Sequence, residues 1–264
     1  MIESWKTRHT FMDDVNIVTK LFLGVALFFF IIFVHHFDVM IYLATLMLIF
    51  MLLTAGTKWK VVLTFTILAT FFALTSSLFM IFYGDGQHEL LKFGFVNITT
   101  ESLVRGLHLS FRTMTVSYFG LSIAFTSQVI MIFYSLMQHL KVKPKIAYAF
   151  MAAFRMIPIM LESLFQLRNA LKMRYQMIDN RNYSGFKRLK HLLIPLLSQN
   201  IRKAHRLSVA MEKKGFKDGP RTYYYYHVPF SYKDLILIGL TVVIVILAFT
   251  FAQILPITGI TDAR

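Results

Sequence analysis

The sequence predicts an all-α, polytopic membrane protein with about five transmembrane helices and a pair of long amphipathic helices on the cytoplasmic side. Hydrophobic residues make up 56% of its 264 residues, and a soluble domain usually carries less apolar bulk and more charge. Several apolar runs come close to the roughly 20 residues that cross a bilayer. A long, strongly basic segment separates the last two of these runs.

Five segments are predicted to span the membrane. Four of them are almost wholly apolar, and the fourth in chain order is a less apolar helical stretch. The first is short for a full crossing, so we expect it to tilt or to use flanking residues. The predicted spans are 21–34, 39–55, 61–83, 102–126 and 232–255.

The positions of the basic residues predict the orientation of these spans. Lys58, Lys60 and the basic segment should lie on the cytoplasmic side, because cytoplasmic loops of membrane proteins are enriched in Lys and Arg. The loops at 35–38 and 84–101 contain few bases and should lie outside. We therefore expect a cytoplasmic N-terminus. The predicted domains are a membrane region with four spans at 1–126, a cytoplasmic helical region at 127–222, and a linker with the last span at 223–264.

Nearly all of the net charge is in the basic segment. Eighteen Lys and Arg and four Asp and Glu fall within 141–221, which gives +14 of the +15 of the whole chain. In a soluble protein this would suggest a nucleic-acid partner. In a membrane protein it is typical of the cytoplasmic face, so we expect no nucleic-acid partner.

The cytoplasmic region is predicted to form one short and two long helices. A short amphipathic helix covers 127–139, and the long helices cover 144–177 and 186–214. Gly215 follows the second long helix and is a good terminating residue. Pro158 and Pro195 lie inside the long helices, where we expect kinks.

No pattern in the sequence predicts catalysis, a cofactor or a metal site. The chain has no cysteine, which excludes disulfides and thiolate metal sites. His35, His36 and Asp38 are adjacent in a short loop and are too few for a closed metal site. The sequence lacks a Gly-rich phosphate-binding loop, so we expect no ATP hydrolysis by this chain itself.

Two motifs in the basic segment resemble those of a known family. Arg155-Met156-Ile157-Pro158, then Glu162, then 170–175 (Ala-Leu-Lys-Met-Arg-Tyr) resembles the first signature of the T component of energy-coupling factor (ECF) transporters, which include the cobalt-transport Q proteins. That signature has Arg-Phe-Ile-Pro, a Glu four residues after the Pro, and a closing Ala-Arg-Gly. Arg155, Pro158, Glu162 and Arg174 are all in register with it.

The second motif ends the second long helix. Residues 210–216 (Ala-Met-Glu-Lys-Lys-Gly-Phe) and 219–222 (Gly-Pro-Arg-Thr) are similar to the family's Ala-Met-Glu-Ala-Arg-Gly-Phe followed by Pro-Arg-Thr. The residues in register are Glu212, Gly215, Pro220 and Arg221. We expect structural roles for Glu212, Pro220 and Arg221, and likewise for Arg155, Pro158 and Glu162 of the first motif.

The sequence departs from the family pattern at both closing triplets. Met173 and Tyr175 replace Ala and Gly on either side of Arg174, and Lys213-Lys214 replaces Ala-Arg. Lysine keeps the charge but lacks the planar fork that pairs with a carboxylate through two hydrogen bonds. We therefore expect coupling to survive with weaker geometric specificity at that end.

The resemblance implies that the two long helices cross and act as coupling helices in an ECF-type ABC importer of a prokaryotic plasma membrane. Their ends would dock on a pair of ABC-type ATPases, and the crossed helices would move a small membrane-embedded subunit that binds a vitamin, a vitamin precursor or a metal ion. The chain itself would be a coupling and scaffold subunit without catalytic activity. The residues expected to dock on the ATPases are Met173, Arg174, Tyr175, Lys213, Lys214 and Gly215.

Two alternative functions are compatible with the residues. The basic helices could bind anionic lipid with no ATPase partner. The chain could also be a stand-alone secondary transporter that uses Arg112, which shares a helix face with Arg105 and His108 inside the span at 102–126. Charged residues inside a span usually face protein or water, so Arg112 is a candidate intramembrane functional residue.

Overall fold

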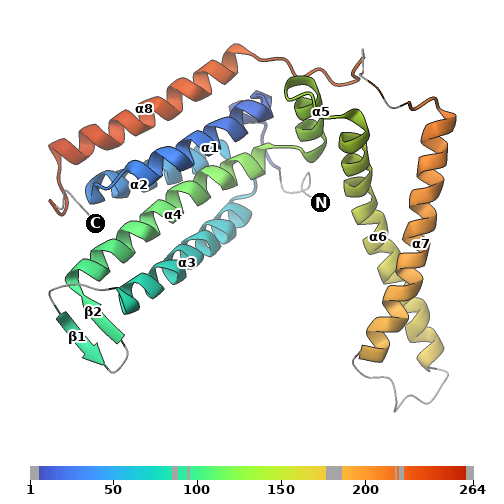
Figure 1. Ribbon diagram of the computed structural model, residues 1–264, viewed down its shortest axis with the longest axis horizontal. Helices are drawn as coiled ribbons and strands as arrows, with labels where there is room; N and C mark the ends of the chain where they lie inside the picture. Colours follow the sequence, from blue (N-terminus) through green and yellow to red (C-terminus); the bar gives the residue numbers. More distant parts are fainter. Residues whose placement is uncertain are drawn as a thin grey trace. The chain divides into compact units, whose positions relative to one another are not determined.

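The computed structural model describes residues 6–84, 89–93, 96–176, 186–217, 219 and 223–259. Within these ranges the chain is a series of helices with one short β-hairpin (Figure 1). The elements in order are the 3₁₀ helix η2 (Phe11–Asp14), α1 (Ile17–Phe33), α2 (Phe37–Thr54), α3 (Trp59–Tyr83), β1 (Glu89–Phe93), β2 (Val96–Thr99), α4 (Thr100–Thr126), α5 (Val129–His139), α6 (Pro144–Gln176), α7 (Phe186–Lys213) and α8 (Tyr232–Ile254).

The helices form two compact units. Unit 1 consists of residues 1–128 and 228–264, and unit 2 of residues 129–227. Unit 1 therefore contains α1 to α4 and α8, while unit 2 contains α5, α6 and α7.

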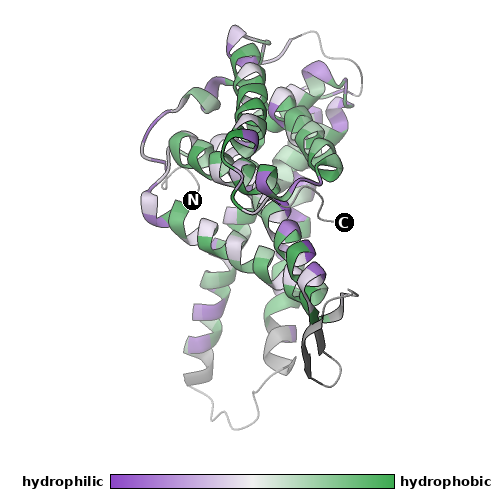
Figure 2. Cartoon of the chain, turned by 90° about the vertical axis from the view of Figure 1, so that its left-hand side faces the viewer, coloured by the Kyte–Doolittle hydropathy of each residue, from purple (hydrophilic) through white to green (hydrophobic). Residues whose placement is uncertain are grey.

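The helices are long and apolar enough for a multi-pass membrane protein. Among the described residues, α2, α3, α6 and α8 could each cross a bilayer, and α4 with α5 would add a fifth if they form one broken span. α1 is apolar but shorter. Figure 2 shows how strongly apolar residues dominate most of these helices. The predicted all-α polytopic fold class is confirmed, and the helix bounds agree with the predicted spans to within a few residues.

α6 differs from the expected set of spans. Its length and composition fit a membrane crossing, although it is the least apolar of the four candidates. Its charged side chains Arg155, Glu162, Arg168 and Lys172 are all exposed. Placing these groups in hydrocarbon would be costly, which favours a position of α6 outside the bilayer core. The cytoplasmic assignment of α6 is kept as a prediction.

The segment 84–101, expected as a loop, contains a hairpin. β1 and β2 pair antiparallel, with Leu91 opposite Ile98 and Phe93 opposite Val96. The β-branched residues of β2 favour extended backbone. Thr99 then ends the hairpin and caps α4, because its hydroxyl accepts a hydrogen bond of 3.1 Å from the backbone N–H of Ser102.

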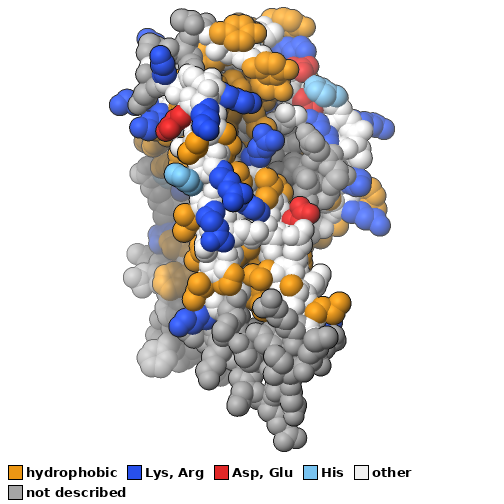
Figure 3. Space-filling model, turned by 90° about the vertical axis from the view of Figure 1, so that its right-hand side faces the viewer, with side chains coloured by type: hydrophobic (Ala, Val, Ile, Leu, Met, Phe, Trp, Pro, Cys, Tyr) orange, Lys and Arg blue, Asp and Glu red, His pale blue; other side chains and the backbone are white. Residues whose placement is uncertain are grey.

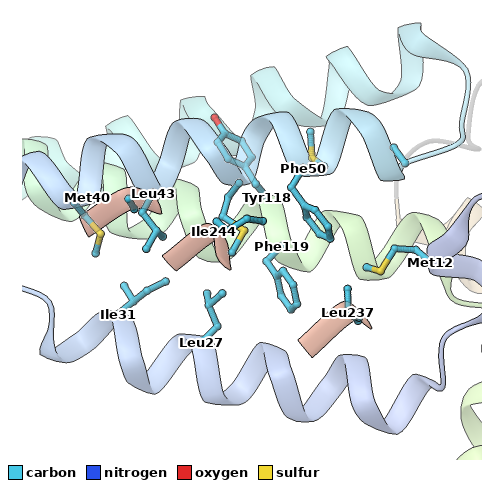
Figure 4. Packing of buried hydrophobic residues seen from close by; sticks show 14 of the residues in the cluster. Met12, Leu27, Ile31, Met40, Leu43, Phe50, Tyr118, Phe119, Leu237 and Ile244 are labelled. Atoms are coloured by element: carbon cyan, nitrogen blue, oxygen red, sulfur yellow. The ribbon is translucent and has the colours of Figure 1, made fainter. Parts of the chain in front are cut away.

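The core of unit 1 lies where η2, α1, α2, α4 and α8 meet (Figure 4). Bulky apolar side chains from these elements form one cluster, in which α4 contributes Tyr118 and Phe119 and α3 adds Val62. α4 also packs against α3 on another side. Other labelled members of the cluster are Met12, Leu27, Ile31, Met40, Leu43, Phe50, Leu237 and Ile244.

Small residues allow α3 and α4 to approach closely. A Cβ atom on Gly106 of α4 would collide with Cγ1 of Ile81 and lie 3.2 Å from the backbone oxygen of Ser77. Ser110, one turn further on, donates its hydroxyl to the carbonyl oxygen of Ala73 at 3.5 Å. Small residues at helix contacts are the usual way for membrane helices to pack tightly.

Gly106→Ala is expected to destabilise unit 1, because the added methyl group has no space and forces α3 away from α4. The expected loss is about 1–3 kcal/mol of unfolding free energy, measured as a lower thermal midpoint in detergent. Gly120→Ala on the same helix is the matched control, because a Cβ there meets no atom within 4 Å. Equal midpoints for the two variants would contradict this account of the α3–α4 contact.

Candidate functional site

α6 and α7 of unit 2 form an antiparallel, crossing pair. Near the middle of both helices the Lys203 ammonium donates a hydrogen bond of 2.9 Å to the hydroxyl of Ser163. Near one end the ring of Tyr148, at the start of α6, lies 5.6 Å from the ring of Phe216, which follows α7. From the Ser163–Lys203 contact to the Tyr148–Phe216 contact, the residue number decreases along α6 and increases along α7. The two helices therefore run antiparallel.

The Ser163 hydroxyl is fully used at the crossing. It donates to the carbonyl oxygen of Ile159 at 2.8 Å and accepts from Lys203. Ser163 is only 6% exposed, so the hydroxyl has little access to other partners. The sequence did not single out either residue, because a lone serine and a lysine among many bases carry no pattern of their own.

The C-terminus of α7 is closed by a Schellman motif. The N–H of Gly215 donates to the carbonyl of Glu212 at 2.9 Å, and the N–H of Phe216 donates to that of Met211 at 3.0 Å. Gly215 has φ = +80°, a left-handed conformation that costs other residues free energy. The expected helix-terminating role of Gly215 is thus explained by its backbone.

Aromatic side chains join this end of α7 to α5 and to the start of α6. The ring of Tyr134 in α5 lies 6.5 Å from that of Tyr148 and 5.3 Å from that of Tyr226. Gln138 of α5 also donates its side-chain amide to the carbonyl oxygen of Tyr226 at 2.6 Å. Each aromatic pair adds about 0.5–1.5 kcal/mol beyond burial, so the cluster fixes where α7 ends.

The residues predicted to dock on a partner lie at the C-terminal ends of the two crossing helices. Arg174 and Tyr175 are in the last turn of α6, preceded by Met173, which is 68% exposed. Lys213 is the last residue of α7, and it is exposed like the Lys214 that follows it. Because the helices are antiparallel, the two sets lie at opposite ends of the pair.

The crossing contact is equidistant from the two basic positions. Arg174 follows Ser163 by eleven residues, and Lys214 follows Lys203 by eleven residues. At 1.5 Å per residue each arm is about 16 Å long. The pair therefore presents two basic ends in a near-symmetric arrangement about one polar contact.

The remaining motif residues lie on α6 and α7 or outside the described residues. Arg155 is exposed, and Pro158 lies inside α6. Glu162 accepts a hydrogen bond of 3.5 Å from the side-chain amide of Gln166. Pro220 and Arg221 are outside the described residues.

Arg112 of α4 is engaged by the end of α1. Its guanidinium donates to the carbonyl oxygens of Ile32 and Val34, at 3.4 and 3.2 Å. These carbonyls end α1, where the helix dipole places negative partial charge. These hydrogen bonds link α4 to the end of α1 within unit 1.

Asp38 is likewise engaged within unit 1. Its carboxylate accepts hydrogen bonds from the backbone N–H groups of Thr258 and Gly259 and from the Thr258 hydroxyl, at 2.7–3.1 Å. Over the part of the chain that the structure describes, no group of three or more His, Asp or Glu side chains could hold a metal ion.

The surface around α7 is strongly basic. Figure 3 shows many Lys and Arg side chains and few acidic ones on the side of the molecule where α7 lies. Apolar side chains are interspersed with them, so this surface combines charge with apolar contact area.

Comparison with known proteins places these features in a family. The model of the cobalt transport protein family, CbiQ, matches residues 8–225. The energy-coupling factor transporter transmembrane protein EcfT of Lactococcus lactis subsp. cremoris (strain MG1363) is 24% identical over 189 residues, which are 69% of this chain and 71% of the relative.

Two further relatives have the same name. EcfT of Streptococcus equi subsp. equi (strain 4047) is 24% identical over 186 residues, which are 67% of this chain and 68% of the relative. EcfT of Macrococcus caseolyticus (strain JCSC5402) is 26% identical over 193 residues, which are 69% and 73% of the two chains.

Gly215→Ala is expected to fray the end of α7, because alanine is strained at φ = +80°. The cost is about 1 kcal/mol, measured as faster amide hydrogen exchange at 211–216. Gly215→Asn is the matched variant and should exchange at a rate closer to wild type, since asparagine tolerates the left-handed conformation better. Wild-type exchange in Gly215→Ala would show that the Schellman motif does not hold this end.

Proposed function

The chain belongs to the cobalt transport protein family, and from this premise we propose that it is the coupling and scaffold subunit of an ECF-type ABC importer. In this role it passes ATP-driven movement from two cytoplasmic ATPases to a membrane-embedded substrate-binding subunit. The observation that carries the proposal is the pair of basic helix ends placed symmetrically about the Ser163–Lys203 contact.

The chemistry of the helix ends suits docking on an acidic groove. Arg174 and Lys214 stand at helix C-termini, where the negative partial charge of the helix favours a cation, and Lys214 is exposed to a partner. Hydrogen bonds from Arg or Lys to a carboxylate are stronger than neutral ones. Arg174 can pair with a carboxylate through two parallel bonds, whereas Lys214 offers a point charge. We therefore expect the α6 end to dock with the greater geometric precision.

The equal arms suggest how movement is transmitted. When the two ATPases approach each other on binding ATP, the ends of α6 and α7 move with them. The Ser163–Lys203 contact then acts as the pivot of the crossed pair, and arms of about 16 Å carry comparable displacements to each side. In this scheme the chain does not hydrolyse ATP, and the ATPases supply the energy.

The apolar surface of α6 fits contact with a membrane-embedded partner. Several large apolar side chains on this helix are exposed, and a contiguous apolar surface of this kind marks a protein or membrane contact. We propose that the substrate-binding subunit, specific for a vitamin, a vitamin precursor or a metal ion, contacts this surface. The exposed apolar residues are Ile146, Phe150, Phe154, Ile157, Ile159, Met160, Leu161 and Phe165.

The basic character of unit 2 supports a cytoplasmic position for the coupling helices at 127–222, with the N-terminus on the same side. The surrounding bilayer would be the plasma membrane of a prokaryote. α6 then lies at the membrane surface, because its exposed charges Arg155, Glu162, Arg168 and Lys172 remain in water while its apolar side chains contact lipid or the partner.

The two alternatives differ in what they require of the helix ends. Binding of anionic lipid depends on the number of bases and weakens smoothly with salt. A stand-alone transporter that uses Arg112 needs that guanidinium accessible in a pathway, yet it is bound to two carbonyls at the end of α1. The Arg112 contacts therefore favour a structural role for this residue.

Arg174→Glu and Lys214→Glu are each expected to weaken recovery of the ATPases in a detergent pull-down with the tagged chain, and the double variant should abolish it. Reversing one cation of a docked charge pair costs about 2–5 kcal/mol, which is roughly 30-fold or more in affinity. Arg202→Glu is the matched control, because Arg202 is exposed on α7 but lies away from either end.

Equal recovery of the ATPases by all these variants would exclude docking through the helix ends. If the wild-type chain recovers no ABC-type ATPase, and liposomes with anionic lipid bind wild type and variants in proportion to their net charge, the lipid-binding alternative is favoured.

A further inference from the structure

The chain passes between unit 1 and unit 2 at two places. A short N-terminal segment of unit 1 makes hydrogen bonds to unit 1 residues beside each of these places. The chain leaves unit 1 after α4, through residues 127–128, and returns before α8, through residues 228–231. Residues 14–20, which include the start of α1, make hydrogen bonds on each side of this passage. All of these contacts lie within unit 1.

At the exit, Lys20 holds the end of α4. Its side chain is completely buried, and its ammonium donates to the backbone carbonyl and to the hydroxyl of Thr126, both at 3.3 Å. Thr126 is the last residue of α4, where the helix dipole favours a cation. A buried ammonium without compensation costs several kcal/mol, so this contact is required by the burial of Lys20.

Nearby carboxylates also attract this charge. Asp13, Asp14 and Asp234 act electrostatically on the Lys20 ammonium, although its hydrogen bonds in the described chain go to Thr126. The ammonium is thus held at the C-terminus of α4 by its hydrogen bonds to Thr126.

At the return, Asn16 and Asp234 hold the segment that leads into α8. The side-chain amide of Asn16 donates to the carbonyl oxygen of Val228 at 3.1 Å. The buried carboxylate of Asp234 accepts the backbone N–H of Asn16 at 2.7 Å and that of Ser231 at 2.6 Å. One carboxylate therefore accepts the backbone N–H groups of the N-cap residues of both α1 and α8, where a negative charge is favoured.

A surface ion pair adds to these buried contacts. Lys233 donates to Asp14 at 2.6 Å, and this hydrogen bond holds the pKa of the Asp14 carboxyl below its ordinary value. Both side chains are partly exposed to solvent, and surface pairs contribute little to stability. The buried groups Lys20, Asn16 and Asp234 therefore dominate.

We propose that the segment Asp14–Lys20 is a clamp that fixes both connections of unit 2 to unit 1, so that movement of α6 and α7 is passed to α4 and α8 instead of being absorbed in the connections. In this inference Lys20 and Asp234 are positioning residues for force transmission. The clamp itself rests on contacts within unit 1, and only its purpose rests on the proposed function.

The clamp explains why a buried lysine stands at the start of α1. Loose connections at 127–128 and 228–231 would rotate about their backbone bonds when the coupling helices move. The hydrogen bonds of the clamp hold Thr126, where the first connection begins, and Val228 and Ser231 in the second connection. A force transmitter needs this stiffness, whereas a passive membrane anchor does not.

The test uses the full chain, whose natural sequence has no cysteine, in lipid nanodiscs. Single spin labels are placed at Gln128→Cys and at Pro229→Cys, both exposed positions in the two connections. Lys20→Met should raise the rotational mobility of the label at 128 at least twofold. Asp234→Asn, which preserves the shape of the side chain, should raise the rotational mobility of the label at 229 at least twofold.

Asp38→Asn is the matched control. Asp38 is as buried as Asp234, at 5% exposure, and also lies in the first turn of its helix. Its partners are Thr258 and Gly259, far along the chain from either connection. Asp38→Asn should leave the mobility of both labels unchanged. If Lys20→Met does not fold, the isosteric Asp234→Asn still decides the question at position 229.

Transmission is tested in the complex with co-purified ATPases. A third label at Val242→Cys, exposed on α8, should change its spectrum when ATP and vanadate are added. That change should fall at least twofold in Lys20→Met and in Asp234→Asn but not in Asp38→Asn, with equal ATPase recovery in all variants.

The outcomes separate the clamp from the docking proposal. Failure of the wild-type chain to recover ATPases would count against docking, while the labels at 128 and 229 would still decide the clamp. Mobility in Asp234→Asn no higher than in Asp38→Asn would overturn the clamp. An α8 label that does not respond to ATP in the wild-type complex, or that responds equally in all variants, would overturn its role in transmission.

Discussion

The packing of α4 against its neighbours is the constraint on which unit 1 depends. α4 contacts α1, α2 and α3, and it is the helix from which the chain continues into unit 2. Different residues of α4 serve these contacts. Tyr118 and Phe119 fill the apolar core, and Gly106 removes a side chain where α3 approaches. A displacement of α4 therefore disturbs several helix contacts at once.

The charged groups of unit 1 are placed mainly at helix ends. Lys20 lies at the C-terminus of α4 and Arg112 at that of α1, whereas Asp38 and Asp234 lie in the first turns of α2 and α8. Each charge has the sign that the local helix dipole favours. The backbone groups at helix ends lack partners within the helix. In a membrane protein these groups need other partners, which Lys20, Arg112 and Asp234 supply.

Unit 2 uses its charges in the opposite way. Most of its described bases are exposed, whereas Lys203, at the α6–α7 contact, donates to the neutral hydroxyl of Ser163. The ring contact between Tyr148 and Phe216 joins the end of α7 to the start of α6, and Tyr134 of α5 packs against Tyr148. Side-chain packing thus sets the geometry of unit 2, and its exposed bases can bind partners. The proposed docking ends and pivot follow from this division.

The sequence by itself determined the helices, the fold class and the family. Helix bounds depend on local patterns, so the predicted 144–177 and 186–214 differ little from α6 and α7, and Gly215 marked the end of α7 through its own backbone freedom. The hairpin at 89–99 was missed because its strands, of five and four residues, are too short to give a clear period-two pattern.

Only the tertiary structure decided which side chains meet. In the sequence, Lys20 reads as a base at the membrane edge, and Ser163 reads as an ordinary helix residue. Lys20 is buried only because the end of α4, 106 residues later, supplies its acceptors. Ser163 lies at the α6–α7 crossing because Lys203 donates a hydrogen bond to it. Arg112 donates to carbonyl oxygens at the end of α1, which is distant in the sequence. Local periodicity predicts which face of a helix is apolar, but the partner of a polar side chain depends on contacts between distant parts of the chain.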